Sequence, residues 1–98
     1  MQIVENWTDI EGKVVSCAPS EELPGFHMLE LAVEKAREVE GFANLLNQTV
    51  GHTLTVFIRA DLAALDDCRP QAEAVCRVRR ATNKRNFVHP EKITFKAR

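Results

Sequence analysis

The chain has 98 residues, 45% of them hydrophobic and 28% charged, and a formal net charge of -1. This length and composition predict one globular domain with a single core. The near-neutral charge argues against a protein that binds duplex nucleic acid, because such proteins are typically strongly basic. Three cysteines without C-x-x-C spacing and three scattered histidines predict neither a disulfide framework nor a metal site, so we expect no cofactor.

The first part of the chain predicts two strands joined by a tight return. Residues 12–17 are rich in β-branched side chains and are followed by a turn rich in proline and glycine. Residues 26–46 are ambiguous, because their apolar side chains fit helical spacing while residues 29–34 also alternate as in a half-buried strand. We interpret residues 26–39 as a strand, since the first strand needs a partner and the turn suits a hairpin.

The middle of the chain contains the clearest strand, residues 53–60, in which apolar and polar side chains alternate. Before it, Gly41 marks a break, and residues 42–46 are compatible with one helical turn. After it, residues 61–67 begin with a capping aspartate and predict a short helix that ends before Pro70. In the strand, the side chains expected to face inward are Leu54, Val56 and Ile58, and those expected to face outward are Thr53, Thr55, Phe57 and Arg59.

Two more strands are predicted in the last third of the chain. Residues 71–80 alternate again, and a polar turn at residues 82–86 separates them from a final strand at residues 87–96. Pro90 limits that strand to a sheet edge or a bulge at this point. The side chains expected to face the core from these two strands are Ala74, Cys76, Val78, Ile93 and Phe95.

The charges are distributed unevenly along the chain. Residues 1–68 contain four basic and twelve acidic residues, a formal charge of -8, whereas residues 69–98 contain nine basic and two acidic residues, a formal charge of +7. Two explanations are open: basic strands lie beside acidic ones within the fold, or the last third forms a basic binding face. We favour the first, because exposed charged residues are more often solvated than functional.

The order of these elements carries a likeness to a known class of small barrels. The residues that carry it are Gly12-Lys13-Val14-Val15, the segment 51–58, and Leu62, Leu65, Val75 and Val78. From about Gly12 to Phe95, the chain resembles the OB-fold and the related TOBE domains. The resemblance implies a mainly β, five-stranded OB-like barrel with one or two short helices and with residues 26–39 as its second strand. The alternative is an α+β fold with a helix at about residues 27–46.

The resemblance also implies a place for a ligand. OB domains often present strands 2 and 3, with the loops after strands 1 and 4, to oligonucleotides or oligosaccharides. Here Phe57 would stack on a base while basic side chains neutralise phosphates, which suits single-stranded RNA or DNA. An equal alternative for Phe57 is that residues 42–46 cover its ring. The predicted nucleic-acid-binding residues are Phe57, Arg59, Arg77, Arg79, Lys84 and Arg85.

Other features of the sequence oppose this interpretation. Glu21 and Glu22 in the first loop, with Glu30 and Glu34 on the second strand, would repel a phosphate backbone. Arg77 and Arg79 have an alternative use that we favour slightly, which is to pair with acidic residues of neighbouring strands. The alternative function is a protein-interaction module that uses separated acidic and basic faces to bind a partner protein or a second copy of itself.

Catalysis and membrane insertion are not expected. Neither a nucleophile elbow nor a glycine-rich phosphate loop accompanies the serines or cysteines, so we predict that the protein is not an enzyme. The odd number of unpaired cysteines indicates a reducing compartment. Because there is neither a signal-like N-terminus nor an apolar stretch of about 18 residues, we expect a soluble, cytoplasmic protein without a membrane partner.

Overall fold

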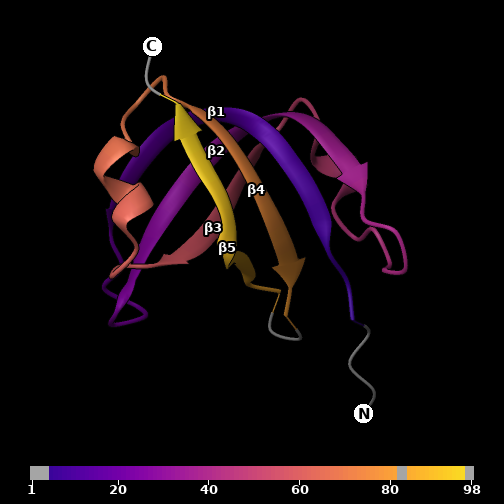
Figure 1. Cartoon of the computed structure of the whole chain (residues 1–98), viewed down its shortest axis with the longest axis horizontal. Helices are drawn as coiled ribbons and strands as arrows, with labels where there is room; N and C mark the ends of the chain where they lie inside the picture. The colour runs from indigo at the N-terminus through magenta and orange to yellow at the C-terminus, as the bar shows by residue number, and fades with distance from the viewer. Residues whose placement is uncertain (1–4, 82–83, 97–98) are drawn as a thin grey trace.

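The computed structural model describes residues 5–81 and 84–96, in which five strands form a closed barrel (Figure 1). Neighbouring strands follow the order β1-β2-β3-β5-β4, with β4 returning to β1. All of these pairs are antiparallel except β3 and β5. The predicted five-stranded barrel is therefore confirmed, and its topology is OB-like. The elements are β1 (Thr8–Pro19), β2 (Phe26–Glu38), η1 (Asn47–Thr49), β3 (Thr53–Arg59), η2 (Ala63–Asp67), β4 (Glu73–Arg80) and β5 (Asn86–Lys96).

The ambiguous segment is the strand β2, as predicted, and the helical alternative is wrong. Leu29, Leu31 and Val33 are all buried, whereas the residues between them are only partly covered. At Leu31 the strand pairs with Val14 of β1 on one side and with Leu54 of β3 on the other. A helix here would leave the backbone groups of β1 and β3 without partners, which outweighs the weak helix propensity of the sequence.

The core fills the inside of the barrel with the side chains that the alternation predicted. Leu54, Val56 and Ile58 of β3 are buried, as are Ala74, Cys76 and Val78 of β4. In β5, Phe95 is buried and Ile93 is partly buried against the same cluster. The largest side chains that complete this core are Ile10, Val14, Leu29, Leu31 and Leu46.

Three local predictions differ from the structure. The first strand begins at Thr8 rather than at residue 12, because residues 8–11 pair with both β2 and β4. The helical turn expected at residues 42–46 lies instead at Asn47–Thr49, after the buried Leu46. The short helix η2 is a 3-10 helix that begins after Leu62 and lacks a side-chain cap, so Asp61 does not cap it.

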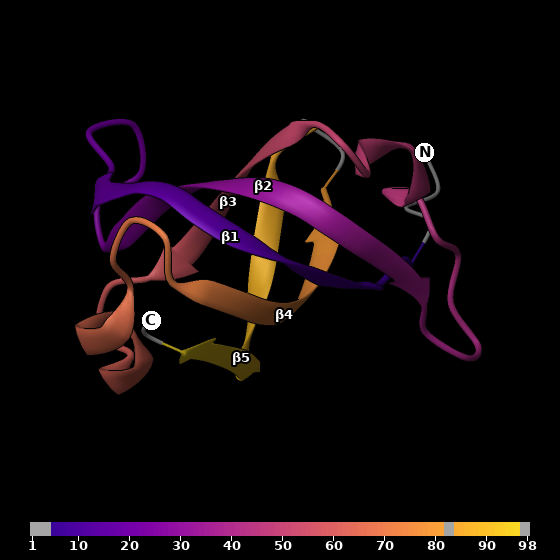
Figure 2. The same ribbon diagram turned by 90° about the horizontal axis from the view of Figure 1, so that it is seen from above.

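The arrangement of the strands leaves two different outer faces. The strands β4 and β5, with η2, lie on the near side in Figure 1, and Figure 2 shows β2 and β3 on the opposite side of the barrel. Of the predicted polar turn, residues 82 and 83 lie outside the described part of the chain. Within that part, no helix is long and apolar enough to cross a membrane.

Candidate nucleic-acid interface

A hollow of about 630 Å³ lies on the outer face of β3, beside the turn between β4 and β5. It combines the loop after β1, the middle of β3 and the start of β5. OB barrels present their ligand-binding surface at the corresponding place. The hollow is lined by Glu22, Thr55, Phe57, Lys84, Arg85 and Asn86.

The turn after β4 brings two basic side chains, those of Lys84 and Arg85, to this hollow. The amide of Ala81 donates a hydrogen bond to the carbonyl of Arg85 at 2.8 Å, and the amide of Lys84 donates to the carbonyl of Ala81 at 3.0 Å. Lys84 has a φ of 64°, a left-handed conformation that reverses the chain tightly. The turn therefore places the side chains of Lys84 and Arg85 at the edge of the barrel beside β3.

Asn86 fixes this turn relative to β3. Its side chain is buried, donates a hydrogen bond to the Thr55 carbonyl at 3.1 Å and accepts one from Nε of Arg80 at 3.2 Å. The backbone register between β3 and β5 is limited to the parallel pairing of Phe57 with Phe87. The side chain of Asn86 thus supplies a hydrogen bond between β5 and β3 in addition to this pairing.

An aromatic cluster adjoins the hollow, and it was not predicted from the sequence. The ring of Phe87 lies 5.8 Å, between centroids, from the ring of Phe57 and 5.8 Å from the ring of Phe26. Phe57 is only 5% exposed although it does not belong to the core cluster, so little of its ring is open to a ligand. Phe26 and Phe87 are half-buried and present more ring surface. The guanidinium of Arg79 lies over Phe87, 5.8 Å from its centroid.

The predicted basic residues have different partners. Arg59 pairs with Asp61 at 2.6 Å, and Arg77 pairs with Asp9 through two hydrogen bonds of 2.9 and 3.3 Å. Arg85 pairs with Glu22 of the first loop. Lys84 is exposed and forms no ion pair within residues 5–81 and 84–96.

The structure therefore divides the predicted site. Phe57, Lys84 and Arg85 line one hollow, and Arg79 joins them through Phe87. Arg59 lies opposite Phe26 in the β2–β3 register, at the end of β3. Arg77 faces β1 instead, where Asp9 raises its pKa, chiefly by hydrogen bonding. The preferred alternative for Arg77 and Arg79, an ion pair across strands, is confirmed for Arg77, whereas Arg79 forms no ion pair among the described residues.

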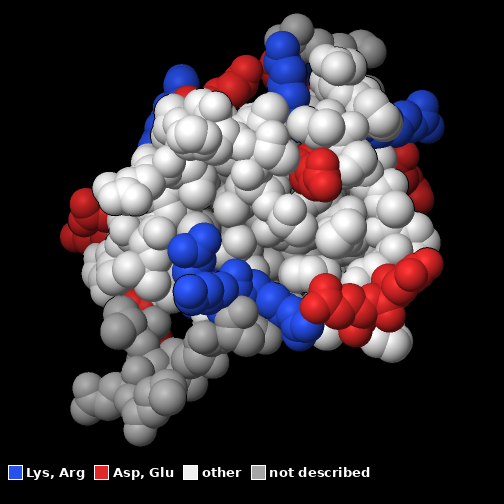
Figure 3. Space-filling model, turned by 180° about the vertical axis from the view of Figure 1, so that it is seen from behind, with Lys and Arg blue, Asp and Glu red and all other residues white. Residues whose placement is uncertain are grey.

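The acidic residues near the interface limit its positive charge. Glu30 lies opposite Thr55 in the β2–β3 register, so its carboxylate is on the same face as the hollow. Figure 3 shows the side of β2 and β3, where most of the surface is uncharged and a basic group adjoins an acidic group along the lower edge. Among the described residues, the charged groups on this side are therefore few and of both signs.

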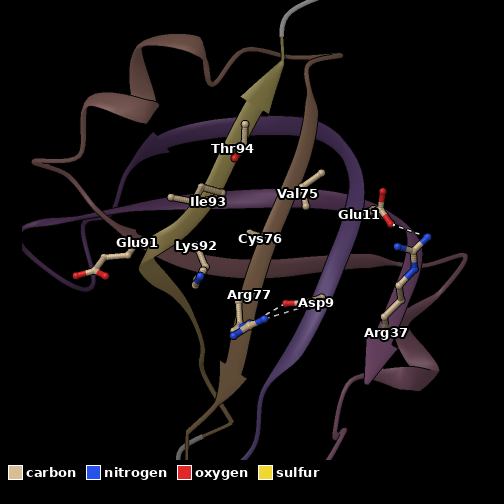
Figure 4. A pocket seen from close by; sticks show the side chains of 10 residues that line it. All are labelled: Asp9, Glu11, Arg37, Val75, Cys76, Arg77, Glu91, Lys92, Ile93 and Thr94. Carbon is tan, nitrogen blue, oxygen red and sulfur yellow. Dashed lines mark hydrogen bonds and ion pairs between the residues drawn. The ribbon is translucent and has the colours of Figure 1, made fainter. Parts of the chain in front are cut away.

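A second hollow, of about 370 Å³, lies on the other side between β1, β4 and β5 (Figure 4). The side chain of Val75, 49% exposed, lines it, and the ion pairs Arg77–Asp9 and Arg37–Glu11 lie along its rim. The ion pair of Arg77 was predicted, but the hollow and the Arg37–Glu11 pair were not, because they depend on the register of β1 with β2 and β4.

Two of the three cysteines, Cys68 and Cys76, are buried. Burial, followed by the nearby charge of Asp9, raises the pKa of the Cys76 thiol to about 12. Burial, together with a hydrogen bond to Cys17, also raises the pKa of the Cys68 thiol. In the described part of the chain, no three His, Cys, Asp or Glu side chains lie close enough together to hold a metal ion.

The closed order β1-β2-β3-β5-β4, with β3 and β5 parallel, is OB-like. No protein-family model, curated protein or solved structure matches the chain.

Proposed function

We propose that this protein is a non-enzymatic OB-like module that binds single-stranded RNA or DNA at the hollow on β3. One observation carries the proposal: Lys84 and Arg85 lie beside the cluster of Phe26, Phe57 and Phe87, at the place where OB barrels bind oligonucleotides. Cations for phosphates and aromatic rings for bases are the two components that single-strand binding needs.

The parts of the site have distinct roles in this proposal. Lys84 and Arg85 neutralise phosphates, while Phe87 and Phe26 offer ring surface on which an unpaired base stacks. Thr55, exposed on β3, supplies a hydroxyl group to the bound nucleic acid in the hollow. Because Glu22 and Glu30 lie on the same face, we expect micromolar or weaker affinity at physiological salt, in the range of non-specific contacts.

The test is a titration of labelled single-stranded oligonucleotides of about 12 nucleotides, followed by fluorescence anisotropy at low and near-physiological salt. Lys84→Glu should weaken binding to all sequences by roughly tenfold, because it replaces a phosphate contact with a repulsive charge. Lys92→Glu is the matched control, since Lys92 is also exposed but lines the second hollow. If the two variants lose affinity equally, or the wild type does not bind at low salt, the proposal is wrong.

The stacking role has its own test. Phe87→Leu keeps an apolar side chain of similar size but removes the aromatic face. If a base stacks on this ring, the variant should lose about 1 to 3 kcal/mol of binding free energy, and its unfolding curve checks that it is folded at the temperature of the binding assay. An unchanged affinity would remove Phe87 from the site.

A second candidate function is a protein-interaction module that uses the hollow between β1, β4 and β5. The observation in its favour is the exposed Val75 bordered by the ion pairs of Arg77 and Arg37, since an apolar centre within a polar rim is typical of protein interfaces. Sizing of the free protein at several salt concentrations tests this candidate. Salt-sensitive self-association that Val75→Lys abolishes, without any oligonucleotide binding, would favour it over the first.

A further inference from the structure

We propose that Glu22 is an internal competitor for the phosphate site: its carboxylate occupies the position at which Arg85 takes a phosphate of a single-stranded nucleic acid. In the free protein, Glu22 therefore engages Arg85 within the hollow, and the ligand reaches Arg85 by displacing the Glu22 carboxylate. This inference rests on the proposed nucleic-acid function.

The contact between the two residues is long-range and lies at the site. Glu22 and Arg85 are 63 positions apart in the sequence, and their side chains meet across the hollow that both of them line. An arginine guanidinium binds carboxylates and phosphates with the same planar arrangement of N–H donors. Glu22 is therefore chemically suited to occupy a phosphate position, and while it does so that donor group of Arg85 is engaged.

The structure of the first loop does not depend on the contact between Glu22 and Arg85. The amide of Ser20 donates to the carbonyl of Phe26 at 2.9 Å, and the amide of Leu23 donates to Oγ of Ser20 at 3.0 Å. These bonds close the base of the loop and do not involve the Glu22 side chain, which is 59% exposed. A change of the Glu22 rotamer alone is thus sufficient to break its contact with Arg85.

The competition should be measurable but modest. Ion pairs between exposed side chains contribute little, because water and salt screen them and both side chains lose rotamer freedom. Removal of the carboxylate charge should therefore tighten nucleic-acid binding by about fivefold. A much larger effect would require a more deeply buried pair than this one.

Glu21 provides a matched control. It precedes Glu22 in the same loop, is exposed and does not line the hollow. Glu21→Gln and Glu22→Gln change the net charge by the same amount, so any general electrostatic effect on nucleic-acid binding is common to both variants. The difference between them isolates the contact with Arg85.

The experiment measures the affinity of each variant for a labelled oligo-dT and a labelled oligo-U of about 12 nucleotides. Glu22→Gln should bind about fivefold more tightly than the wild type, and Glu21→Gln less than about twofold. In an Arg85→Gln background, the gain from Glu22→Gln should vanish, because the residue that is competed for is absent. Unfolding temperatures of all variants check that each is folded.

The outcomes separate this inference from the function on which it rests. Equal gains for Glu21→Gln and Glu22→Gln, or a gain that persists without Arg85, would overturn the competition while leaving the nucleic-acid function in place. If neither the wild type nor Glu22→Gln binds either oligonucleotide at low salt, both proposals are wrong.

Discussion

Gly12→Ala tests whether the close approach of β1 and β2 depends on the absence of a side chain. Gly12 is buried at an irregularity in the β1–β2 register and pairs with Val33 on one side and with Ala74 of β4 on the other. An added Cβ would overlap the carbonyl oxygen of Ala32 and lie 3.0 Å from its carbonyl carbon and 3.2 Å from Cα of Val33. All of these are backbone atoms, so no side-chain rotation relieves the overlap.

The size of the effect follows from this geometry. Overpacking in well-packed sites typically costs about 1 to 3 kcal/mol. We expect about 3 kcal/mol here, the upper end, because β1 is held by strands on both sides and cannot shift away. In a domain of this size, that loss lowers the unfolding temperature by roughly 12 to 24 °C, which thermal unfolding followed by circular dichroism would detect.

Gly25→Ala is the control for the glycine backbone itself. Gly25 has a φ of +88°, but an added Cβ would meet no atom within 4 Å. Its substitution should therefore cost only the conformational penalty of about 1 to 2 kcal/mol. If Gly12→Ala proves no more destabilising than Gly25→Ala, the explanation by close approach of the two strands is wrong.

Three further predictions concern the core, the β3–β5 contact and the thiols. Leu29→Ala, at a fully buried position of β2, should lower the free energy of unfolding by about 2 to 5 kcal/mol in urea titrations. Asn86→Ala should lower it by about 1 to 3 kcal/mol, because the Thr55 carbonyl loses its partner. Cys76 should resist thiol reagents at pH 8 in the native state, since burial raises its pKa to about 12 from an ordinary value of 9.0. Because the folded pKa is the higher one, its contribution to stability is complete below about pH 9 and is lost as the pH rises toward 12, a loss that Cys76→Val should reduce.

The strands could be predicted from the sequence where one periodicity dominates. The alternation of residues 53–60 and 71–80 predicted the inward faces of β3 and β4, including Cys76. For β2, periodicity alone slightly favoured a helix, and the need of the first strand for a partner gave the right answer. The position of η1 was not predicted. Leu46, expected to end the helical turn, is buried, and the turn begins only after it.

The candidate site was only partly predictable, because it depends on which strands are neighbours. The basic turn with Lys84 and Arg85 is visible in the sequence as a polar segment. The aromatic cluster is not, since Phe26, Phe57 and Phe87 are far apart in the chain and meet only through the pairing of β3 with β2 and β5. Phe57 lies outside the core cluster, as the alternation predicted, but its ring is buried beside that of Phe87.

Ion pairs within the fold neutralise part of the charge asymmetry of the chain. The number of basic residues that contact phosphates then sets how the affinity depends on salt. The ion pairs Arg77–Asp9 and Arg85–Glu22 each join the acidic first part of the chain to its basic last part. If all nine basic residues of the last third contacted phosphates, the logarithm of the affinity would fall with the logarithm of the salt concentration with a slope of about -6. With phosphate contacts only from Lys84 and Arg85, a slope of about -1.4 is expected for a single strand. A measured slope near -6 would show that the binding surface is the whole basic segment and not the hollow on β3.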